Sequence, residues 1–251
     1  MQLPHALTRF ALLPASVALL ASLCASSALA DSFTISYYAA GVQSSAASSS
    51  VETFNSAVPA NGVLTTTFNN SQLTGTYTGN FVLSNANLTG GAGGVGKFIT
   101  TTSTYTLTLS QNVNYFGLWF SALDQGNRLS FFEDSTLLYT FTPAAFAALV
   151  GACPSSSGYC GNPNPAQAGN TGQQYAFLNF FDSNGTFNKV VFTESPANGG
   201  FESDNHTVGN IDSGPGGTII GVTPEPSSLL LMGTGVIGLI GEVRRRVRNN
   251  A

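Results

Sequence analysis

Charge is the scarcest property of this sequence. Only 8% of its 251 residues are Asp, Glu, Lys or Arg. Between residues 31 and 222 there are three basic residues, Lys97, Arg128 and Lys189, against ten acidic ones, so this stretch has a net charge of −7. Such a surface does not bind nucleic acid or an anionic membrane through charge, because both require clustered Lys and Arg. It attracts divalent cations instead.

Histidine and cysteine are scarce as well, with two and three copies. His206 is the only histidine after residue 31, so a Ser-His-Asp catalytic site would depend on it, and the sequence holds no Gly-x-Ser-x-Gly motif. Cys153 and Cys160 flank a loop rich in Pro, Gly and Ser. In an exported protein we expect such a pair to form a disulfide, since two thiols alone do not complete a metal site.

The N-terminus has the pattern of an export signal. Arg9 precedes an apolar stretch from Phe10 to Leu23, and Ala28 and Ala30 are small residues at the positions that a signal peptidase reads. Residues 1–30 are therefore predicted to be a secretory signal peptide, cleaved before Asp31.

The C-terminus combines three features in a fixed order. Pro224, Glu225 and Pro226 come first, then the uncharged run Ser227–Gly241, and then a cluster formed by Arg244, Arg245, Arg246 and Arg248. Fifteen uncharged residues are fewer than the roughly 20 of a typical spanning helix, but hydrophobic mismatch costs only fractions of a kcal/mol per Å. The run is predicted to be a short transmembrane helix, with the arginines on the cytoplasmic side.

This order closely resembles the PEP-CTERM sorting signal of bacterial surface proteins, over residues 222–248. The resemblance rests on the combination, because the Pro-Glu-Pro triplet alone is common. It implies that an exosortase recognises the triplet, cuts near it and passes the protein to the cell surface or the extracellular matrix. The membrane would then hold the chain only transiently. Residues 223–251 are thus predicted to be a sorting tail that follows one ectodomain, residues 31–222.

The ectodomain reads as an all-β protein. Its 192 residues suffice for one core, and they are rich in Ser, Thr, Asn and Gly, which favour strands and turns. Thr100–Ser110 alternates polar and apolar residues, as a half-buried strand does, and Val113–Phe120 is apolar enough for a central strand. Only Pro143–Val150 is predicted to be helical. Further strands are predicted at 33–38, 63–68, 78–83, 128–133, 136–141, 174–181, 187–194, 200–209 and 218–222, which together indicate a β-sandwich of jelly-roll type.

The ectodomain also resembles a group of exosortase-dependent surface proteins. The matching segments are 51–55, 90–94, 113–127 and 200–208. The group is known mainly by its sorting signal and its β fold, so this resemblance implies little about function.

Carboxylates suggest a calcium site. Glu202 and Asp204 are two residues apart on a predicted strand, so both side chains point to one face. Glu52, on the first strand of a jelly roll, would lie near the last strands and complete an oxygen-rich ligand set for structural calcium. The alternative is that these acids cap turns or face water. Gly91–Lys97 fits the spacing of a phosphate-binding loop, but Phe98 replaces the Ser or Thr that binds magnesium, so we expect only a glycine-rich loop.

The leading interpretation is an exported surface or matrix protein without catalytic activity, associated with extracellular polysaccharide. One alternative is a glycan-binding or calcium-dependent module, with aromatic residues serving either as a sugar platform or, as we favour, as core: Tyr115, Trp119, Phe120, Phe131 and Phe132. A glycoside-active enzyme would need paired carboxylates, and nothing marks Glu194, Glu202 or Asp204 as the acid. An ice-binding protein would need a regular threonine array, of which Thr100–Thr108 offers one row.

Overall fold

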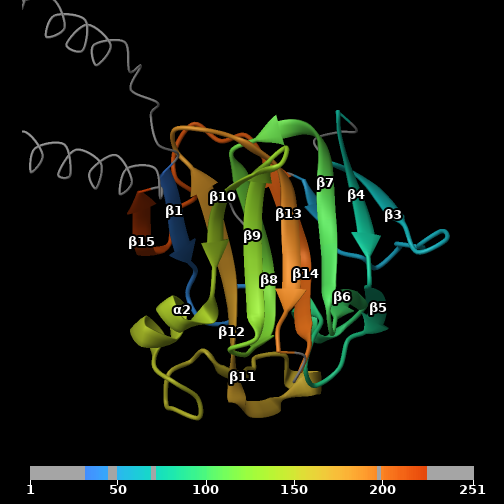
Figure 1. The fold of residues 1–251 in the computed structure, drawn as a ribbon. Helices are drawn as coiled ribbons and strands as arrows, with labels where there is room; N and C mark the ends of the chain where they lie inside the picture. Colours follow the sequence, from blue (N-terminus) through green and yellow to red (C-terminus); the bar gives the residue numbers. More distant parts are fainter. Residues whose placement is uncertain (1–31, 45–49, 69–71, 197–198, 225–251) are drawn as a thin grey trace, which may run out of the picture.

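The computed structural model describes residues 32–44, 50–68, 72–196 and 199–224. These residues form two antiparallel sheets packed face to face (Figure 1), which confirms the all-β sandwich. The predicted signal peptide and the predicted transmembrane helix lie outside the described residues. Within the described ranges, no helix is long and apolar enough to cross a membrane.

The larger sheet has nine strands. Its order is β15 (Thr218–Pro224), β1 (Ser32–Tyr37), β12 (Gly169–Asp182), β8 (Tyr115–Leu123), β14 (Phe201–Gly209), β6 (Lys97–Thr101) and β5 (Val82–Asn85), while β11 (Cys160–Asn162) pairs with β12 and β2 (Val51–Glu52) with β14. The six-stranded sheet has the order β10 (Thr136–Phe141), β9 (Asn127–Glu133), β13 (Phe187–Glu194), β7 (Thr104–Val113), β4 (Leu73–Gly79) and β3 (Leu64–Phe68).

Side-chain alternation directs one face of β7 into the core. Tyr105, Leu107 and Leu109 are buried, whereas Thr104 and Thr108 are exposed, as the sequence predicts. In contrast, β8 is buried at all nine positions. Its second face is covered too, by a smaller cluster around Trp119 and Phe177, so loops cover this part of the outer face of the nine-stranded sheet.

Two predicted strands are wrong, and both lie where the chain crosses between sheets. The predicted strand Thr100–Ser110 is divided into β6 and β7, which belong to different sheets. The predicted strand 78–83 spans the end of β4 and the start of β5, again in different sheets. Gly79 has a φ of 108° there, and a Cβ on it would lie 2.9 Å from the Thr104 carbonyl oxygen. The polar and apolar pattern continues through such a corner, so it does not mark the break.

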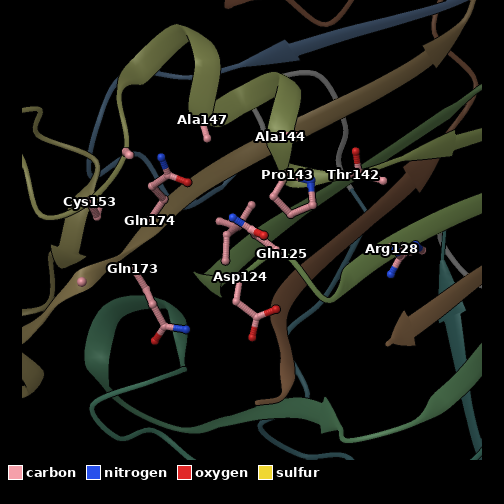
Figure 2. Close-up of a pocket in the computed structure, with 13 residues that line it drawn as sticks. Asp124, Gln125, Arg128, Thr142, Pro143, Ala144, Ala147, Cys153, Gln173 and Gln174 are labelled. Carbon is pink, nitrogen blue, oxygen red and sulfur yellow. The ribbon is translucent and has the colours of Figure 1, made fainter. Parts of the chain in front are cut away.

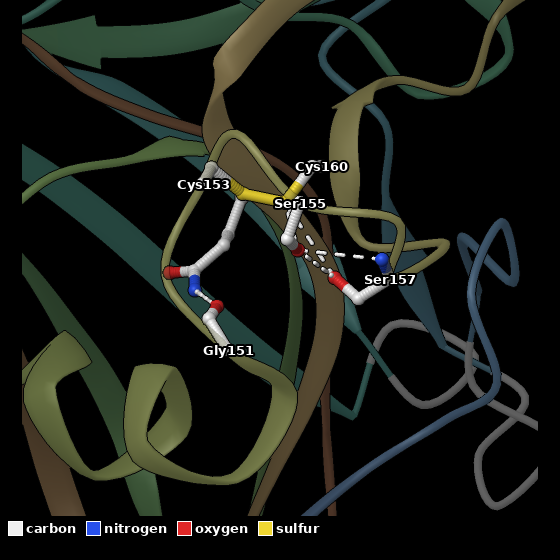
Figure 3. The surroundings of a disulfide bond; sticks show 6 residues. Gly151, Cys153, Ser155, Ser157 and Cys160 are labelled. Carbon is white, nitrogen blue, oxygen red and sulfur yellow. Dashed lines mark hydrogen bonds between the residues drawn. A yellow bond between two sulfur atoms is a disulfide. The ribbon is translucent and has the colours of Figure 1, made fainter.

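One helix and one disulfide form the end of the sandwich near β11. Helix α2 (Pro143–Val150) has the predicted bounds, with proline at an early position. Two short 3₁₀ helices, η1 (Ala92–Gly94) and η2 (Pro165–Gln167), accompany it. Cys153 and Cys160 form a disulfide, as predicted, in the connection between α2 and β11 (Figure 3).

Candidate functional site

The sorting corner is the place where β1 begins and β15 ends. The two strands are antiparallel, so Ser32 lies opposite Pro224 and Phe33 lies opposite Thr223. Residue 32 follows the predicted signal peptidase site, and Pro224 is the first residue of the Pro-Glu-Pro triplet. Proline has no N–H to donate and fits at the end of an edge strand. The first described residue and the first residue of the triplet therefore lie at one corner of the sheet. Glu225, Pro226 and the arginines Arg244, Arg245 and Arg246 lie outside the described residues.

Strand β15 is an edge strand that a β-bulge divides into two parts. A register shift in its pairing with β1 falls between Ile35 and Ser36. Before this bulge, the Ser36 hydroxyl donates to the Gly216 carbonyl oxygen at 2.6 Å, and Ile220 packs against the core. After the bulge, Gly221 contributes no side chain. The four residues nearest the sorting tail pair with residues 32–35 of β1.

A second candidate site, the polar cleft, lies between α2 and the β8–β9 turn (Figure 2). It has a volume of about 570 Å³, and its polar lining includes Asp124, Gln125, Arg128 and Gln173. The same four residues also line an adjoining hollow of about 510 Å³, which extends to Glu194 and Gly199. Helix α2 forms the apolar wall with Pro143, Ala144 and Ala147.

The β8–β9 turn holds the polar side of the cleft in place. The Gly126 N–H donates to Asp124 Oδ1 at 2.7 Å, and the Asp124 N–H donates to Asn127 Oδ1 at 3.0 Å. The buried Asn127 amide in turn donates to Glu194 Oε2 at 2.7 Å. Arg128 donates to the Gly126 carbonyl oxygen at 3.2 Å. The exposed Gln125 therefore projects from a rigid turn.

Two carboxylates converge beside this turn. A Cβ placed on Gly199 would lie 2.4 Å from Asp124 Oδ2 and 3.9 Å from Glu194 Oε1. Burial, with Asp124 and Glu194 nearby, raises the pKa of Glu202 to about 7. Glu202 itself is not among the residues that line the cleft. Sequence reasoning missed the role of Asp124, because its neighbours come from distant segments.

Two of the three predicted calcium ligands, Asp204 and Glu52, accept backbone N–H groups in the fold. Asp204 accepts backbone N–H groups from Ala92 at 2.8 Å and from Asn205 at 2.7 Å, and burial raises its pKa to about 7. Glu52 lies on β2, opposite His206 of β14, and accepts the Phe54 N–H at 2.5 Å. In the described part of the chain, no three His, Cys, Asp or Glu side chains form a group suited to a metal ion. Calcium binding stays a prediction.

The glycine-rich loop is a cover over the nine-stranded sheet. Asp204 holds Ala92, the Asn164 amide donates to the Gly91 carbonyl oxygen at 2.7 Å, and the Lys97 N–H donates to Asn55 at 2.8 Å. The loop leads into strand β6 and not into a helix, in agreement with the sequence analysis. The segments that carry the second resemblance meet here, because Asn55, the loop and β14 are in contact.

His206 is a core residue. It is fully buried and hydrogen-bonded to Tyr77 Oη through Nδ1 at 3.1 Å and to Ser203 Oγ through Nε2 at 2.9 Å. Ser203 is also bonded to Tyr105 Oη at 3.1 Å. Burial lowers the pKa of His206 to about 3. The histidine and serine therefore form part of a polar network between the sheets, out of reach of a substrate.

The suggested aromatic platform is not exposed. Tyr115, Trp119, Phe120 and Phe131 are fully buried, so the core interpretation is the correct one for them. Phe132 is half-buried beneath the Lys189 ammonium group, 4.8 Å from the ring centre.

The outer side of the six-stranded sheet carries a threonine array, which we call the threonine face. Thr65 lies opposite Thr76, and Thr76 opposite Thr108. A second row joins Thr78 to Thr106. The single row expected from the sequence is therefore wrong, because β3, β4 and β13 add to it. The exposed or half-buried members are Thr65, Thr67, Thr74, Thr76, Thr78, Thr104, Thr106, Thr108 and Thr193.

These observations define a two-sheet β-sandwich whose last described strand leads into the Pro-Glu-Pro triplet. Comparison with protein families agrees: residues 222–246 match the PEP-CTERM protein-sorting motif, so the chain carries this motif and is an exosortase target that crosses the membrane to the cell surface or beyond. No curated protein and no solved structure matches the chain.

Proposed function

We propose that this chain is a surface or extracellular-matrix protein without catalytic activity, which is released from its signal peptide by signal peptidase and processed near Pro224–Pro226 by exosortase. The sorting motif carries this proposal, because it begins within the last strand of the sandwich. A complete folded domain is therefore the cargo of the sorting step. Its low charge and hydroxyl-rich surface suit a hydrated polysaccharide layer.

The chemistry of the described residues supports a non-catalytic role. The hydrogen-bonded pair Ser203 and His206 is fully buried, so it does not meet a substrate. The cleft-lining Asp124 is engaged by its own turn, and Glu202, whose raised pKa would suit a general acid, is absent from the cleft lining.

The sorting claim is tested by Glu225→Ala in cells that produce the cognate exosortase. We expect full-length protein to accumulate in the membrane fraction. Asp212→Ala, which removes an exposed acid outside the motif, is the matched control and should be released like the wild type. Normal release of Glu225→Ala would contradict the proposal.

A second candidate function is glycan binding in the polar cleft. Carboxylate, amide and guanidinium groups are good partners for sugar hydroxyls, and the volume lies in the range of small-ligand sites. Polysaccharide arrays probed with released protein test this candidate. Gln125→Ala should abolish the signal, whereas the remote Gln111→Ala should not. Turnover of a bound glycan would instead favour the enzyme alternative.

Calcium dependence is measured on the same protein. If calcium is a structural ligand at Glu202 and Asp204, chelator lowers the melting temperature and Glu202→Gln removes this shift. Calorimetry without binding in the millimolar range, together with an unchanged melting temperature, would rule it out.

The threonine face is the specific observation behind an ice-binding alternative, because it supplies several aligned rows of hydroxyl and methyl groups. Ice recrystallisation assays decide this. Activity that Thr76→Lys removes and Thr136→Lys, on the edge strand β10, leaves intact would support it. No activity in the wild type would exclude it.

A further inference from the structure

One residue of the Pro-Glu-Pro triplet belongs to the folded sheet. Pro224 is the last residue of β15 and lies opposite Ser32 of β1. Only Glu225 and Pro226 separate it from the uncharged run that begins at Ser227. Two extended residues span about 7 Å. As long as β15 is fully paired, the triplet is held between the edge of the sandwich and the membrane.

An enzyme that reads a linear motif binds it as an extended segment, with backbone contacts and side-chain pockets of its own. Backbone groups that are engaged by β1 are not available for such contacts. Recognition of the whole triplet therefore requires Pro224 to leave the sheet.

The structure of β15 allows a partial release. The bulge opposite Ile35 and Ser36 divides it into an outer half, Gly221–Pro224, and an inner half, Thr218–Ile220. The inner half is anchored by Ile220, which is half-buried against the core, and by the neighbouring bond from Tyr38 Oη to the Pro215 carbonyl oxygen at 2.7 Å. Among the described strands, β15 pairs with β1 alone, so the outer half has a partner on only one side.

We propose that the outer half of β15 is a releasable strand, and that exosortase processes the chain only when this half is detached from β1. This inference rests on the proposed sorting function. Detachment up to the bulge lengthens the free segment before the uncharged run from two residues to six, or about 20 Å. The inner half keeps the sandwich intact meanwhile. The equilibrium between the paired and the detached outer half therefore sets the fraction of membrane-held protein that exosortase can process.

A cross-strand disulfide tests the proposal. Thr34 and Val222 occupy directly opposite positions, and such positions are close enough to be bridged. In the full-length variant Thr34→Cys/Val222→Cys, the lock removes the open state, so release from the membrane should fall by at least about tenfold. A reducing agent should restore it. The single variants Thr34→Cys and Val222→Cys are the controls and should be processed normally.

A loosened strand gives the opposite result. Gly221→Pro removes a backbone donor at the bulge, and we expect processing at least as fast as in the wild type. For the oxidised Thr34→Cys/Val222→Cys variant, a melting temperature equal to or above that of the wild type shows that the locked protein is folded. Wild-type processing of the folded, oxidised lock would overturn the inference while Glu225→Ala still blocks release. Normal release of Glu225→Ala would instead overturn the proposed function itself.

Discussion

His206 shows how one side chain connects the two sheets. Its ring stacks on Phe192 of the six-stranded sheet, with ring centres 5.1 Å apart and nearly parallel planes. Phe54 and Phe116 contact it edge-on, and Tyr77 and Ser203 accept or donate its two hydrogen bonds. A neutral imidazole can make all of these contacts. A protonated one would be a buried charge without an anionic partner in its hydrogen bonds, which explains the pKa of about 3.

This pKa gives a pH dependence of stability. The unfolded chain binds a proton at His206 below about 6.5 and the folded chain only below about 3, so the unfolded state gains protons as the pH falls between these values. The free energy of unfolding should therefore decrease from pH 6.5 to pH 3, by at most about 5 kcal/mol from this group. His206→Gln keeps polar contacts without titrating, and urea unfolding of both proteins should show the smaller acid loss in the variant.

The comparison with His206→Gln is needed because two carboxyls act in the opposite direction. The pKa values of Glu202 and Asp204 are raised to about 7 in the fold from 4.5 and 3.8. Their contribution is complete at low pH and is lost as the pH rises through about 7. Equal pH slopes in the wild type and the variant would contradict the role assigned to His206.

Among the elements, the sequence predicts most of the longer strands but misses β11 and most of β4. The period of two in β7 and the bounds of α2 are local properties, and both predictions are confirmed. The chain changes sheets after Gly79 and Thr101, and the strands that follow or precede these corners pair with distant segments: β7 with β13, and β6 with β14. The calcium prediction shows the same limit, because Asp204 is engaged by Ala92, 112 residues away.

The glycine-rich loop offers a direct test of close packing. A Cβ on Gly90 would lie 2.4 Å from the ring of Phe98, which is buried. Gly90→Ala should therefore lower the free energy of unfolding by about 1–3 kcal/mol, as overpacking does. Gly214→Ala has no atom within 4 Å of the new methyl group and should unfold like the wild type. Equal stability of both variants would show that the loop moves away from the sheet without cost.

The disulfide is predicted to stabilise the connection beside the polar cleft. It joins residues seven apart in the sequence, and closing so short a loop contributes about 2–3 kcal/mol in the chain-entropy treatment. Cys153→Ser/Cys160→Ser should lose this amount in a denaturant titration. Reductant should destabilise the wild type equally and leave the double variant unchanged. If reductant also lowers the free energy of unfolding of the double variant, its effect on the wild type does not come from this disulfide.

At the scale of the whole molecule, strand register separates the two candidate sites. Phe33 lies opposite Asp182 of β12, near the sorting corner, whereas Gln174 of the same strand lies opposite Leu123, beside the polar cleft. Eight residues of β-strand span roughly 25 Å, and β11 lies at the end of the sandwich away from the start of β1 (Figure 1). The tail is readable from the sequence because exosortase reads a linear motif. The distance between the tail and the polar cleft cannot be read from the sequence, because it depends on the strand register.

This separation predicts the orientation of the membrane-held protein. If the uncharged run at 227–241 inserts in the membrane as proposed, the sorting corner lies within a few residues of the bilayer, and we expect the polar cleft to face outward. We expect a bulky, membrane-impermeant maleimide to label Gln125→Cys at the same rate in the membrane-held Glu225→Ala background and in released protein. Asn184 is also exposed, but it lies beside Ser183, whose N–H donates to the Ser32 carbonyl oxygen at 3.0 Å. Labelling of Asn184→Cys should be several times slower while the chain is held, because the bilayer blocks approach to this corner.

Protection of Gln125→Cys, with Asn184→Cys freely labelled, would show that the sandwich lies the other way round and that the cleft opens toward the membrane.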